Sequence, residues 1–449
     1  MKNQKDVVVI GAGAAGLAAA LQLSQVGASV LILEARDRIG GRIFTLRDPL
    51  HGAPVELGAE FIHGFSPATW SLIQRNGLRA IEVEGDEWCV EDDSLCRCDF
   101  FSDVQKVLQK MNDRQPDESF RSFLARCCPE PGSSRQERLN ERAIRYVSGF
   151  NAADPGRVSV HWLVRDRRAV EKIEGDRSFR LVGGYQSLIE IFLGQLADAG
   201  VTVQTSAVVE KIEWSDGRAV VSGRGKDGVF TIEVSRALIT VPLGVLQSGP
   251  GSEGSIRFVP ALPNSKVEAL GKLEMGKVIR VVLVFRKRFW DGLKGEDSRT
   301  LEEMSFLLSR DDYFPTWWTL MPSKVPVITG WAPAHSAERL SGQAEALVVE
   351  QALRTLSKLL GISMSDLEAW LASANFHDWQ NDPFSRGAYS YAKVGADGAQ
   401  EVLAAPLADT LFFAGEATNL YGHDGTVHGA IETGVRAAAE ILLGMEKAA

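Results

Sequence analysis

The sequence predicts an α/β protein of more than one domain, and three observations support that prediction. The chain has 449 residues, of which 45% are hydrophobic and 24% charged. This composition is typical of a large folded protein, and it excludes a disordered chain, a collagen-like repeat and a bundle of membrane spans. A βαβ pattern with three closely spaced glycines opens the chain, and a short apolar strand followed by a long helix closes it. At about 150 residues per domain, the length corresponds to about three domains.

The charge and the cysteines limit the partners and the compartment. A net charge of −9 argues against nucleic acid or an anionic membrane surface as the main partner. The odd number of cysteines is not a disulfide framework, and their spacing does not match a zinc site. We therefore predict no metal, reduced thiols and a cytoplasmic location. The cysteines are Cys89, Cys96, Cys98, Cys127 and Cys128.

The first predicted element is a buried strand over residues 6–10, which runs directly into a GAGAAG turn at residues 11–16. A helix and a second strand over residues 28–33 follow, and that strand ends at Glu34. The same apolar stretch could be mistaken for a membrane span, but its glycines and polar residues favour the βαβ unit. The order strand, glycines, helix, strand and acid is the dinucleotide-binding pattern.

Each glycine of this turn has a predicted role. Gly11 permits the tight turn, Gly13 lets a pyrophosphate approach the backbone, and Gly16 allows close packing of helix on strand. Glu34 is placed to bind a ribose hydroxyl, which disfavours a 2′-phosphate. The unit alone leaves NAD and FAD open. Ala14 and Ala15 complete the predicted contact set at the start of the helix.

A basic turn follows Glu34 and contains Arg36, Gly41 and Arg42. Arginines in this position can pair with pyrophosphate oxygens as forked donors. By spacing alone they could equally form a solvated basic turn.

Four blocks resemble the flavin-containing amine oxidases, a family that includes polyamine oxidases, monoamine oxidases and the lysine-specific histone demethylase. The blocks are EARDRIGGR (34–42), ELGAEFIHG (56–64), TVPLGVL (240–246) and FFAGEATNLYGHDGTVHGAIETG (412–434). Their motifs are most similar to the polyamine-oxidase branch. The resemblance implies FAD and an α/β, Rossmann-like FAD-binding domain of the glutathione-reductase/amine-oxidase type. It also implies a second domain, for the substrate, built of a mixed sheet and helices.

In this interpretation both domains are discontinuous. Residues 1–79, 180–254 and 371–449 form the FAD-binding domain, and residues 80–179 and 255–370 form the substrate domain. The C-terminal block predicts a strand at 411–414 and a helix capped by Thr426. The resemblance implies that Gly425, Thr426 and Val427 face the flavin and that Glu416 contacts the ribityl or phosphate region. Further FAD contacts implied in the same way are Gly58, Ala59, Glu60, Phe61, Val208, Trp379 and Gly415.

The chemistry implied by the resemblance is the oxidation of an amine to an imine by hydride transfer to flavin N5. Hydrolysis of the imine then gives an aldehyde or ketone, and reoxidation by oxygen gives hydrogen peroxide. Tyr389 would form one wall of an aromatic cage for the amine, although it could be a core tyrosine. His63 could accept a hydrogen bond from the substrate ammonium, although a single histidine is more often structural. Ala388 replaces the cysteine that bonds flavin in monoamine oxidases, which predicts noncovalent FAD.

Two positions bear on the substrate and on the electron acceptor. Phe61 stands where related amino-acid oxidases carry a carboxylate-binding arginine, which disfavours an amino-acid substrate. Arg280 stands where the family usually has a lysine near flavin N5, a lysine tied to oxygen reactivity. Arginine does not deprotonate and is bulkier, so slow reoxidation by oxygen is predicted. The alternatives are a dehydrogenase or desaturase that uses another acceptor, or an amino-acid oxidase, and a histone-demethylase-type interaction protein ranks last.

Two further features have both a structural and a functional interpretation. Residues 82–93 hold seven acids, which could gather polyamine cations but more often form a solvated hairpin. Trp317, Trp318 and Trp331 could line a pocket or simply pack in a core. The expected partners are a small amine and oxygen or another acceptor, with no nucleic acid and no membrane.

Overall fold

A parallel sheet is assembled from three separated stretches of the chain. A computed structural model of the protein describes residues 5–91, 94–129 and 134–448. The sheet has five strands in the order β10-β2-β1-β14-β23, and each pairing is parallel. Its strands are β1 (Val7–Ile10), β2 (Val30–Leu33), β10 (Thr202–Gln204), β14 (Arg236–Ile239) and β23 (Leu411–Phe413). The strands predicted at 6–10, 28–33 and 411–414 are confirmed.

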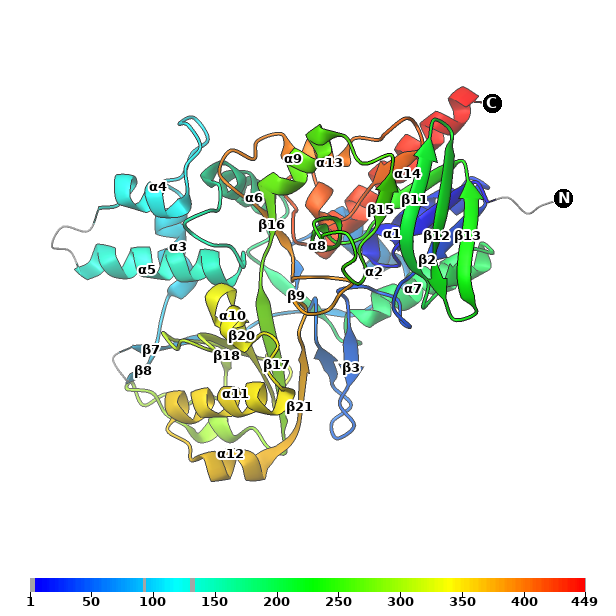
Figure 1. The fold of residues 1–449 in the computed structure, drawn as a ribbon. Helices are drawn as coiled ribbons and strands as arrows, with labels where there is room; N and C mark the ends of the chain where they lie inside the picture. The colour runs from blue at the N-terminus through cyan, green and yellow to red at the C-terminus, as the bar shows by residue number, and fades with distance from the viewer. Residues whose placement is uncertain (1–4, 92–93, 130–133, 449) are drawn as a thin grey trace.

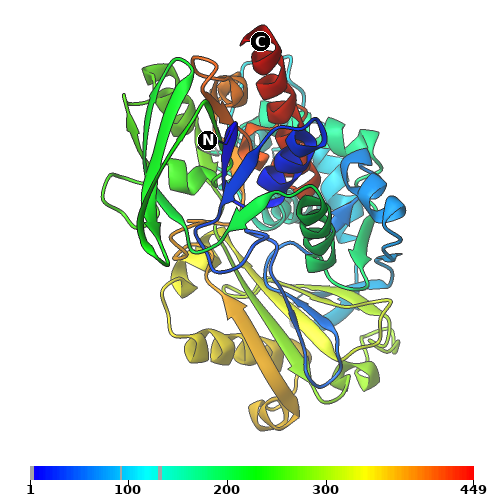
Figure 2. The same cartoon turned by 90° about the vertical axis from the view of Figure 1, so that its right-hand side faces the viewer.

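Both faces of this sheet are covered, and three of its strands, β1, β2 and β23, are accordingly apolar at every position. Val7 and Val9 pack among helices, whereas Val8 and Ile10 pack against a second, four-stranded sheet. Figures 1 and 2 show these three layers, with the helices and the second sheet on opposite sides. The helices are α1 (Ala14–Gln25), α7 (Gln186–Asp198) and α14 (Val427–Ala448), and the second sheet contains β11 (Val208–Ser215), β12 (Arg218–Gly225), β13 (Gly228–Val234) and β15 (Arg257–Val259).

A second part of the molecule is built on a mixed seven-stranded sheet in the order β21-β17-β20-β19-β18-β7-β8. The pairing of β18 with β7 is parallel and the other pairings are antiparallel. The mixed sheet expected for the substrate domain is therefore present (Figure 1). Its strands are β7 (Asp86–Glu91), β8 (Ser94–Arg97), β17 (Val278–Phe285), β18 (Met304–Leu308), β19 (Thr316–Thr319), β20 (Val327–Pro333) and β21 (Leu371–His377), and α10 (Ala334–Leu340), α11 (Glu345–Leu360) and α12 (Met364–Trp370) pack beside them.

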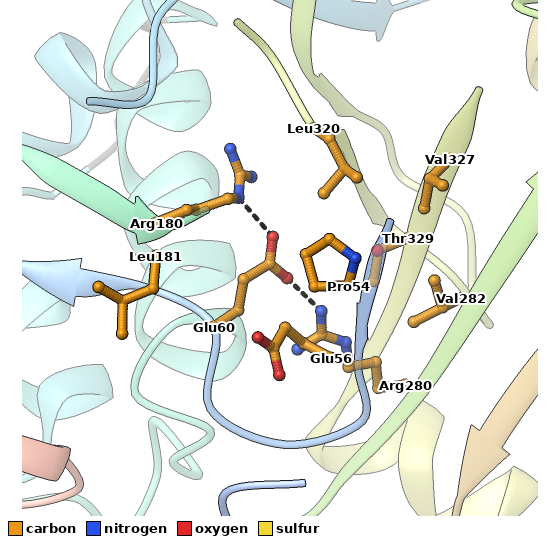
Figure 3. Close-up of a pocket in the computed structure, with 10 residues that line it drawn as sticks. All are labelled: Pro54, Glu56, Glu60, Arg180, Leu181, Arg280, Val282, Leu320, Val327 and Thr329. Carbon is orange, nitrogen blue, oxygen red and sulfur yellow. Dashed lines mark hydrogen bonds and ion pairs between the residues drawn. The ribbon is translucent and has the colours of Figure 1, made fainter. Parts of the chain in front are cut away.

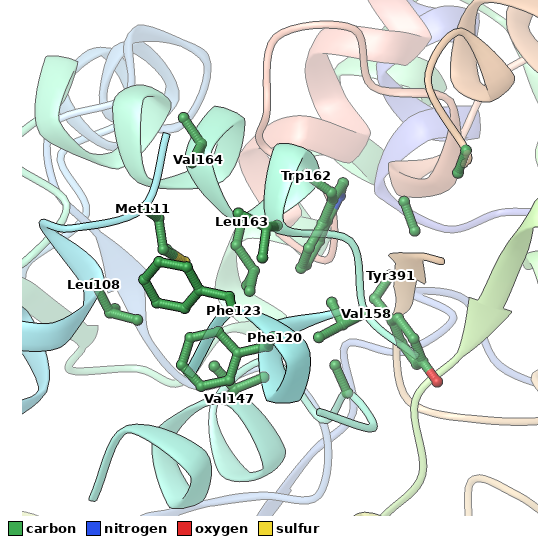
Figure 4. Close-up of a cluster of buried hydrophobic side chains, with 14 of the residues drawn as sticks. Leu108, Met111, Phe120, Phe123, Val147, Val158, Trp162, Leu163, Val164 and Tyr391 are labelled. Atoms are coloured by element: carbon green, nitrogen blue, oxygen red, sulfur yellow. The ribbon is translucent and has the colours of Figure 1, made fainter. Parts of the chain in front are cut away.

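A helical group completes this part, as expected for residues 80–170. Its core contains Phe120 and Phe123 from one helix and Leu163 and Val164 from another (Figure 4). Ser119 and Ser159 each cap a helix by accepting a hydrogen bond from a backbone amide three residues later. The helices are α3 (Phe100–Leu108), α4 (Phe120–Cys127), α5 (Ser134–Gly149) and α6 (Val160–Lys172).

Short elements join the two parts. Strand β21 lies in the seven-stranded sheet although residues 371–377 fall in a predicted FAD-binding segment, and β15 pairs with β11 although residues 257–259 fall in a predicted substrate segment. The domain limits themselves stay a prediction. The remaining strands are β3 (Thr45–Arg47), β4 (Pro54–Glu56), β5 (Ile62–His63), β6 (Ala80–Glu82), β9 (Ser178–Leu181), β16 (Leu273–Met275) and β22 (Ser390–Ala392). The remaining helices are α2 (Pro67–Arg75), α8 (Leu243–Leu246), α9 (Asn264–Lys272) and α13 (Ala399–Ala404), with short 3-10 turns η1 (Phe289–Gly292) and η2 (Glu416–Thr418).

The acidic run at 82–93 forms part of a hairpin made by β7 and β8. It is not a purely solvated hairpin, because β7 also pairs with β18 and buries Trp88. Glu82 and Glu91 are paired with Arg177 and Arg142. These acids are therefore partly neutralised, while Asp92 and Asp93 lie outside the described residues.

The prediction of five reduced thiols is wrong, because Cys89 and Cys98 form a disulfide. Pairing of β7 with β8 brings these cysteines to the same end of the hairpin, a proximity that counting and spacing rules do not capture. Cys96, Cys127 and Cys128 are free. Among the described residues, no helix is long and apolar enough to cross a membrane.

Candidate functional site

The glycine turn between β1 and α1 is shaped for close backbone packing on one side and for an anion on the other. A Cβ at Gly11 would lie 2.7 Å from Thr240 Oγ1, and one at Gly16 would lie 2.0 Å from the Gly11 carbonyl oxygen. By contrast, a Cβ at Gly13 would meet nothing within 4 Å. Gly11 and Gly16 are therefore needed for close packing of the backbone, whereas Gly13 leaves space for a ligand.

The first turn of α1 supplies free backbone donors beside that space. The helix begins at Ala14, and its N-terminal residue, Gly13, offers no side chain to cap the following amides. Unsatisfied amides at a helix N-terminus attract phosphate groups. Gly41 closes one side, since a Cβ there would lie 3.4 Å from Gly13 Cα. The turn, with Ala14 and Ala15, thus fits the pyrophosphate of a dinucleotide.

Glu34 lies at the end of β2 with its carboxylate held in place. It accepts hydrogen bonds from the amides of Ala12, at 2.8 Å, and Arg36, at 2.9 Å. Each oxygen keeps a further lone pair, so a ribose hydroxyl can still bind. The Arg36 guanidinium, however, is paired at 2.7 Å with Asp382. Burial alone would raise the pKa of Asp382, but His377 and Arg36 hold it well below its usual range.

Arg42 and Glu416 join the N-terminal motif to the C-terminal block. Arg42 Nη1 donates to Glu416 Oε1 and to the Ala388 carbonyl, each at 2.8 Å. Glu416 Oε2 accepts from Ser390 Oγ at 2.6 Å and from the Gly425 amide at 2.9 Å. Donors from three separate parts of the chain therefore meet around one buried carboxylate.

The N-terminus of α14 is capped as predicted. Thr426 Oγ1 accepts a hydrogen bond from the Gly429 amide at 2.9 Å, and the helix begins at Val427. Gly425 has a φ of +71°, and a Cβ there would lie 3.1 Å from Tyr389 Cδ2. The start of this long helix, with its positive dipole end, therefore lies against the predicted cage tyrosine.

The loop after β4 contributes further predicted contacts. A Cβ at Gly58 would lie 1.9 Å from the Arg42 carbonyl oxygen, which also accepts from the Ala59 amide at 3.1 Å. Trp379 Nε1 donates to the Leu57 carbonyl at 2.8 Å. At the other end, Val208 follows Ala207, whose amide donates to the Glu34 carbonyl, and the Gly415 amide donates to Thr433 Oγ1 at 2.9 Å. These backbone contacts bring the predicted FAD residues into one connected region.

Arg280 is held in a buried ion-pair network (Figure 3). Its guanidinium donates to the Gly58 carbonyl at 2.7 Å and is paired with the Glu60 carboxylate. Glu60 also accepts from Arg180 Nε at 2.5 Å and from Trp318 Nε1 at 3.0 Å. Burial would raise the pKa of Glu60, but the two arginines lower it below its usual value. Glu60, predicted as an FAD contact, thus has its side chain engaged by three donors, and Arg180 carries no sequence signal that would have linked it to Arg280.

A cavity of about 20 Å³ lies beside this network, which is room for about one water molecule. Glu56 shares it with Glu60 and Arg280 (Figure 3). Burial raises the pKa of Glu56 to about 7, against hydrogen bonds from Thr45 and the Tyr185 amide. Glu56 is therefore a second acid next to Arg280 and, unlike Glu60, its charge changes near neutral pH.

Aromatic side chains extend from this region toward the helical group. We call them the aromatic group. Trp318 and Trp331 belong to it, with ring centroids 5.6 Å apart, whereas Trp317 is buried in the core. Tyr389 joins it through its hydroxyl, which donates to the Phe150 carbonyl at 2.6 Å. The members are Phe61, Phe101, Tyr146, Phe150, Phe306, Trp318, Trp331 and Tyr389.

His63 lies at the edge of the aromatic group, with its ring centroid 6.2 Å from that of Phe61. Its Nδ1 is 3.4 Å from Ser178 Oγ. Burial lowers the pKa of His63 to about 4, so the imidazole is neutral at pH 7. It can therefore accept a hydrogen bond from an ammonium group, as predicted, and its catalytic role stays a prediction.

Comparisons with known proteins agree with this geometry. The chain is 31% identical to "Lysine-specific histone demethylase 1 homolog 1" of Arabidopsis thaliana over 97% of this chain and 52% of that protein. It is 30% identical to "Polyamine oxidase 3" of Oryza sativa subsp. japonica over 97% of this chain and 88% of that protein. The chain thus spans about half or less of the first demethylase relatives that it matches.

Solved structures share the fold. A putrescine oxidase bound to putrescine superposes with a TM-score of 0.79 at 21% identity, covering 98% of this chain and 99% of that one. Cyclohexylamine oxidase from Brevibacterium oxydans IH-35A gives a TM-score of 0.77 at 21% identity, covering 99% and 100%. These structures confirm the predicted fold class.

The family comparison covers nearly the whole chain. The family model "Flavin containing amine oxidoreductase" matches residues 14–125 and 105–442. The expected FAD cofactor is thereby confirmed. The chain belongs to the flavin-containing amine oxidoreductase family.

Proposed function

We propose that this protein oxidises a primary or secondary amine, including polyamines, with noncovalently bound FAD. When bound, FAD would accept a hydride at N5 as the imine forms, and oxygen would take the electrons to give hydrogen peroxide. Hydrolysis of the imine would release an aldehyde or ketone. The observation that carries the proposal is the meeting of Arg42, Glu416 and the Gly425 amide, because it joins the glycine turn to the start of α14.

The chain's own groups would bind and orient both molecules. The amides of the first turn of α1 and the space at Gly13 would hold the pyrophosphate, and Glu34 would hold a ribose. The N-terminus of α14 would stabilise negative charge that builds on a reduced ring. Ala388 provides no nucleophile for a covalent link, which supports noncovalent binding.

The aromatic group would receive the amine. Tyr389 contacts Gly425 at the start of α14 and would present its ring face to the amine. Neutral His63 would accept a hydrogen bond from the substrate ammonium and favour loss of its proton.

An amino-acid substrate is disfavoured because the arginines near the site are already paired with a carboxylate of the protein. Phe61 offers no donor to a carboxylate, and Arg180 and Arg280 are both paired with Glu60. Arg180 also donates to the carbonyls of Met321 and Thr319, at 2.9 and 3.0 Å. A substrate carboxylate would have to displace Glu60 from one of these arginines.

A second candidate is a dehydrogenase that passes electrons to an acceptor other than oxygen. It is supported by Arg280, which is fixed by Glu60 and by the Gly58 carbonyl. A demethylase-type function would rest on the demethylase relatives, of which this chain matches about half or less. The cytoplasmic location loses its support, since it rested partly on thiols that the Cys89–Cys98 disulfide removes.

Anaerobic bleaching of the flavin spectrum by a panel of amines, polyamines and amino acids tests the proposal. We expect bleaching by amines and by no amino acid, followed by peroxide formation when air is admitted. Bleaching by no amine would overturn the proposal. Bleaching by amines without peroxide on re-aeration would favour the dehydrogenase.

A further inference from the structure

Glu56, the last residue of β4, is a buried carboxyl group held by uncharged donors. It is 7% exposed. Its Oε1 accepts a hydrogen bond from the Tyr185 amide at 2.7 Å, and its Oε2 accepts one from the Thr45 hydroxyl at 2.6 Å. The neighbouring acid, Glu60, is instead paired with two arginines. Uncharged donors offset the cost of burying a negative charge less well than arginines do, so Glu56 is the acid of the two that favours its protonated form.

The hydrogen bonds to Glu56 determine where a proton on it would lie. The Tyr185 amide can only donate. The Thr45 hydroxyl accepts from the Gln186 amide at 3.0 Å and has no acceptor other than Glu56 among the described residues. Both contacts therefore present a hydrogen to Glu56. A proton bound by Glu56 must lie on a lone pair that these donors leave free, and it needs an acceptor there.

The cavity of about 20 Å³ can supply that acceptor. Glu56 is part of its wall, and the volume is room for about one water molecule. A water molecule in such a place needs two to four polar partners. Glu60, Arg180 and Arg280 belong to the same wall and provide them (Figure 3). A water in this cavity could therefore exchange a proton with Glu56.

The charges around the cavity balance only when both acids are ionised. The wall then carries two positive charges from the arginines and two negative charges from Glu56 and Glu60. The arginines hold the pKa of Glu60 low, whereas burial raises the pKa of Glu56 to about 7. Burial also raises the pKa of Tyr185, so its hydroxyl stays neutral. Glu56 is thus the member of this cluster that changes charge near neutral pH, and its protonation leaves the cluster with one net positive charge.

Arg280 connects this cluster to the expected FAD site. Its Nη1 donates to the carbonyl of Gly58, an expected FAD contact two residues after Glu56, at 2.7 Å. In the function proposed above, on which this inference rests, reduction places negative charge on the flavin near Arg280. Negative charge nearby favours the protonated form of a carboxyl group. Reduction of the cofactor should therefore increase the affinity of Glu56 for a proton.

The proposed reaction also requires one proton that the hydride does not bring. The amine delivers two electrons and one proton as a hydride equivalent, whereas conversion of oxygen to hydrogen peroxide consumes two electrons and two protons. One more proton must reach the oxygen in each turnover. We propose that Glu56 takes up one proton from solvent when the cofactor is reduced and releases it, through water in the cavity, when oxygen is converted to peroxide. Glu56 acts through the cavity and Arg280 in this scheme and touches none of the reacting atoms.

The pH dependence of the flavin midpoint potential counts the protons that enter with the two electrons. We expect the wild-type holoenzyme, reduced with dithionite, to take up one proton more than Glu56→Gln at about pH 8, where Glu56 is ionised before reduction. The two should take up equal numbers in acid, where Glu56 is already protonated. Glu350→Gln, which removes an exposed partner of Arg354 on α11, is the control and should behave as the wild type.

Infrared difference spectra of the reduced and oxidised holoenzyme observe the proton directly. At about pH 8, reduction of the wild type should produce a protonated carboxyl band that Glu56→Gln lacks. Glu56→Asp keeps a titratable carboxyl group and should retain a band at a shifted position. In stopped-flow mixing with aerated buffer, Glu56→Gln should be reoxidised about tenfold more slowly or slower still, because it has no proton to release.

These measurements distinguish the inference from the proposed function, since chemical reduction needs no amine. Equal proton uptake by the wild type and Glu56→Gln would overturn the inference while leaving amine oxidation intact. Absence of a carboxyl band on reduction of the wild type would overturn it without any variant. Absence of flavin bleaching by any amine, with proton uptake that still depends on Glu56, would overturn the proposed reaction but not the proton uptake by Glu56.

Discussion

Arg42 and Glu416 lie 2.8 Å apart although 374 positions separate them in the chain. The carboxylate that pairs with Arg42 also accepts a hydrogen bond from the backbone amide of Gly425, which lies just before the start of α14. The N-terminal dinucleotide motif and the C-terminal helix are thus positioned by one side chain. Glu416 is 4% exposed, so water does not weaken these bonds.

Glu416→Gln should weaken FAD binding without unfolding the protein. The amide would keep the hydrogen bonds in part but lose the charge that holds Arg42, and hydrogen bonds to charged groups contribute about 1.5–3 kcal/mol. We expect the dissociation constant of FAD to rise by about tenfold or more, measured by fluorescence titration of the apoprotein. Glu338→Gln, which removes an exposed partner of Lys277, is the control. Equal FAD affinity in the two variants would contradict the prediction.

Gly13→Ala and Gly16→Ala should separate ligand binding from folding. At Gly13 a methyl group meets no protein atom within 4 Å, whereas at Gly16 it would lie 2.0 Å from the Gly11 carbonyl oxygen. The melting temperature of the apoprotein should therefore be nearly unchanged in the first variant and clearly lower in the second. FAD affinity should fall in both. Undiminished FAD binding by Gly13→Ala would show that the space at Gly13 does not hold the pyrophosphate.

Glu60→Gln should destabilise the protein strongly, because it leaves Arg180 and Arg280 buried without their shared carboxylate. Removing one partner of a buried ion pair costs about 3–5 kcal/mol. Asp409→Asn removes the more exposed partner of Arg236 and should cost about 1 kcal/mol or less. Urea unfolding of both variants gives the free energies of unfolding. A similar loss in the two variants would mean that the Glu60 network contributes little.

Arg280→Lys should speed reoxidation of the reduced flavin by air. A lysine at this position would restore the residue that the family resemblance implies beside N5, and its ammonium is more compact than the guanidinium. Stopped-flow mixing of anaerobically reduced enzyme with aerated buffer measures the rate. If the rate does not change, the arginine is not what limits the reaction with oxygen.

Asp166→Asn should stabilise the protein at alkaline but not at acidic pH. The pKa of Asp166 in the folded state, about 7, lies above its ordinary value. The stabilisation linked to its proton is therefore complete in acid and is lost as the pH rises toward 7. Asparagine does not titrate, so the variant should gain on the order of 1–3 kcal/mol over wild type at pH 8 and little near pH 4. Urea unfolding midpoints across this pH range measure the difference in stability between variant and wild type. A difference that does not change with pH would contradict the raised pKa of Asp166.

Local patterns predicted much of the fold because its ends are built from local signals. The run at 7–10 with the glycines at 11–16 defines a strand, a turn and a helix start without help from distant residues. Thr426 likewise marks the beginning of α14 through its own hydroxyl. Such features depend on backbone conformation and on short-range hydrogen bonds.

The parts that were missed depend on contacts between distant segments. Arg180 lies 120 positions from Glu60, and nothing near Arg180 in the sequence indicates a carboxylate partner. The ion pair between Arg36 and Asp382 likewise spans 346 positions. The Cys89–Cys98 disulfide depends on the pairing of β7 with β8. Charge networks of this kind become visible only when the strands are placed side by side.

The order of strands in the parallel sheet also constrains how the protein is made. β23, at residues 411–413, pairs with β14, and α14 packs on α1. A nascent chain that has released only its first 400 residues therefore lacks an edge strand, the covering helix and Glu416. Because synthesis proceeds from the N-terminus at about 5–20 residues per second, cofactor insertion must follow translation of nearly the whole chain. Until then the glycine turn lacks the groups that complete its site, namely Glu416 and the N-terminus of α14.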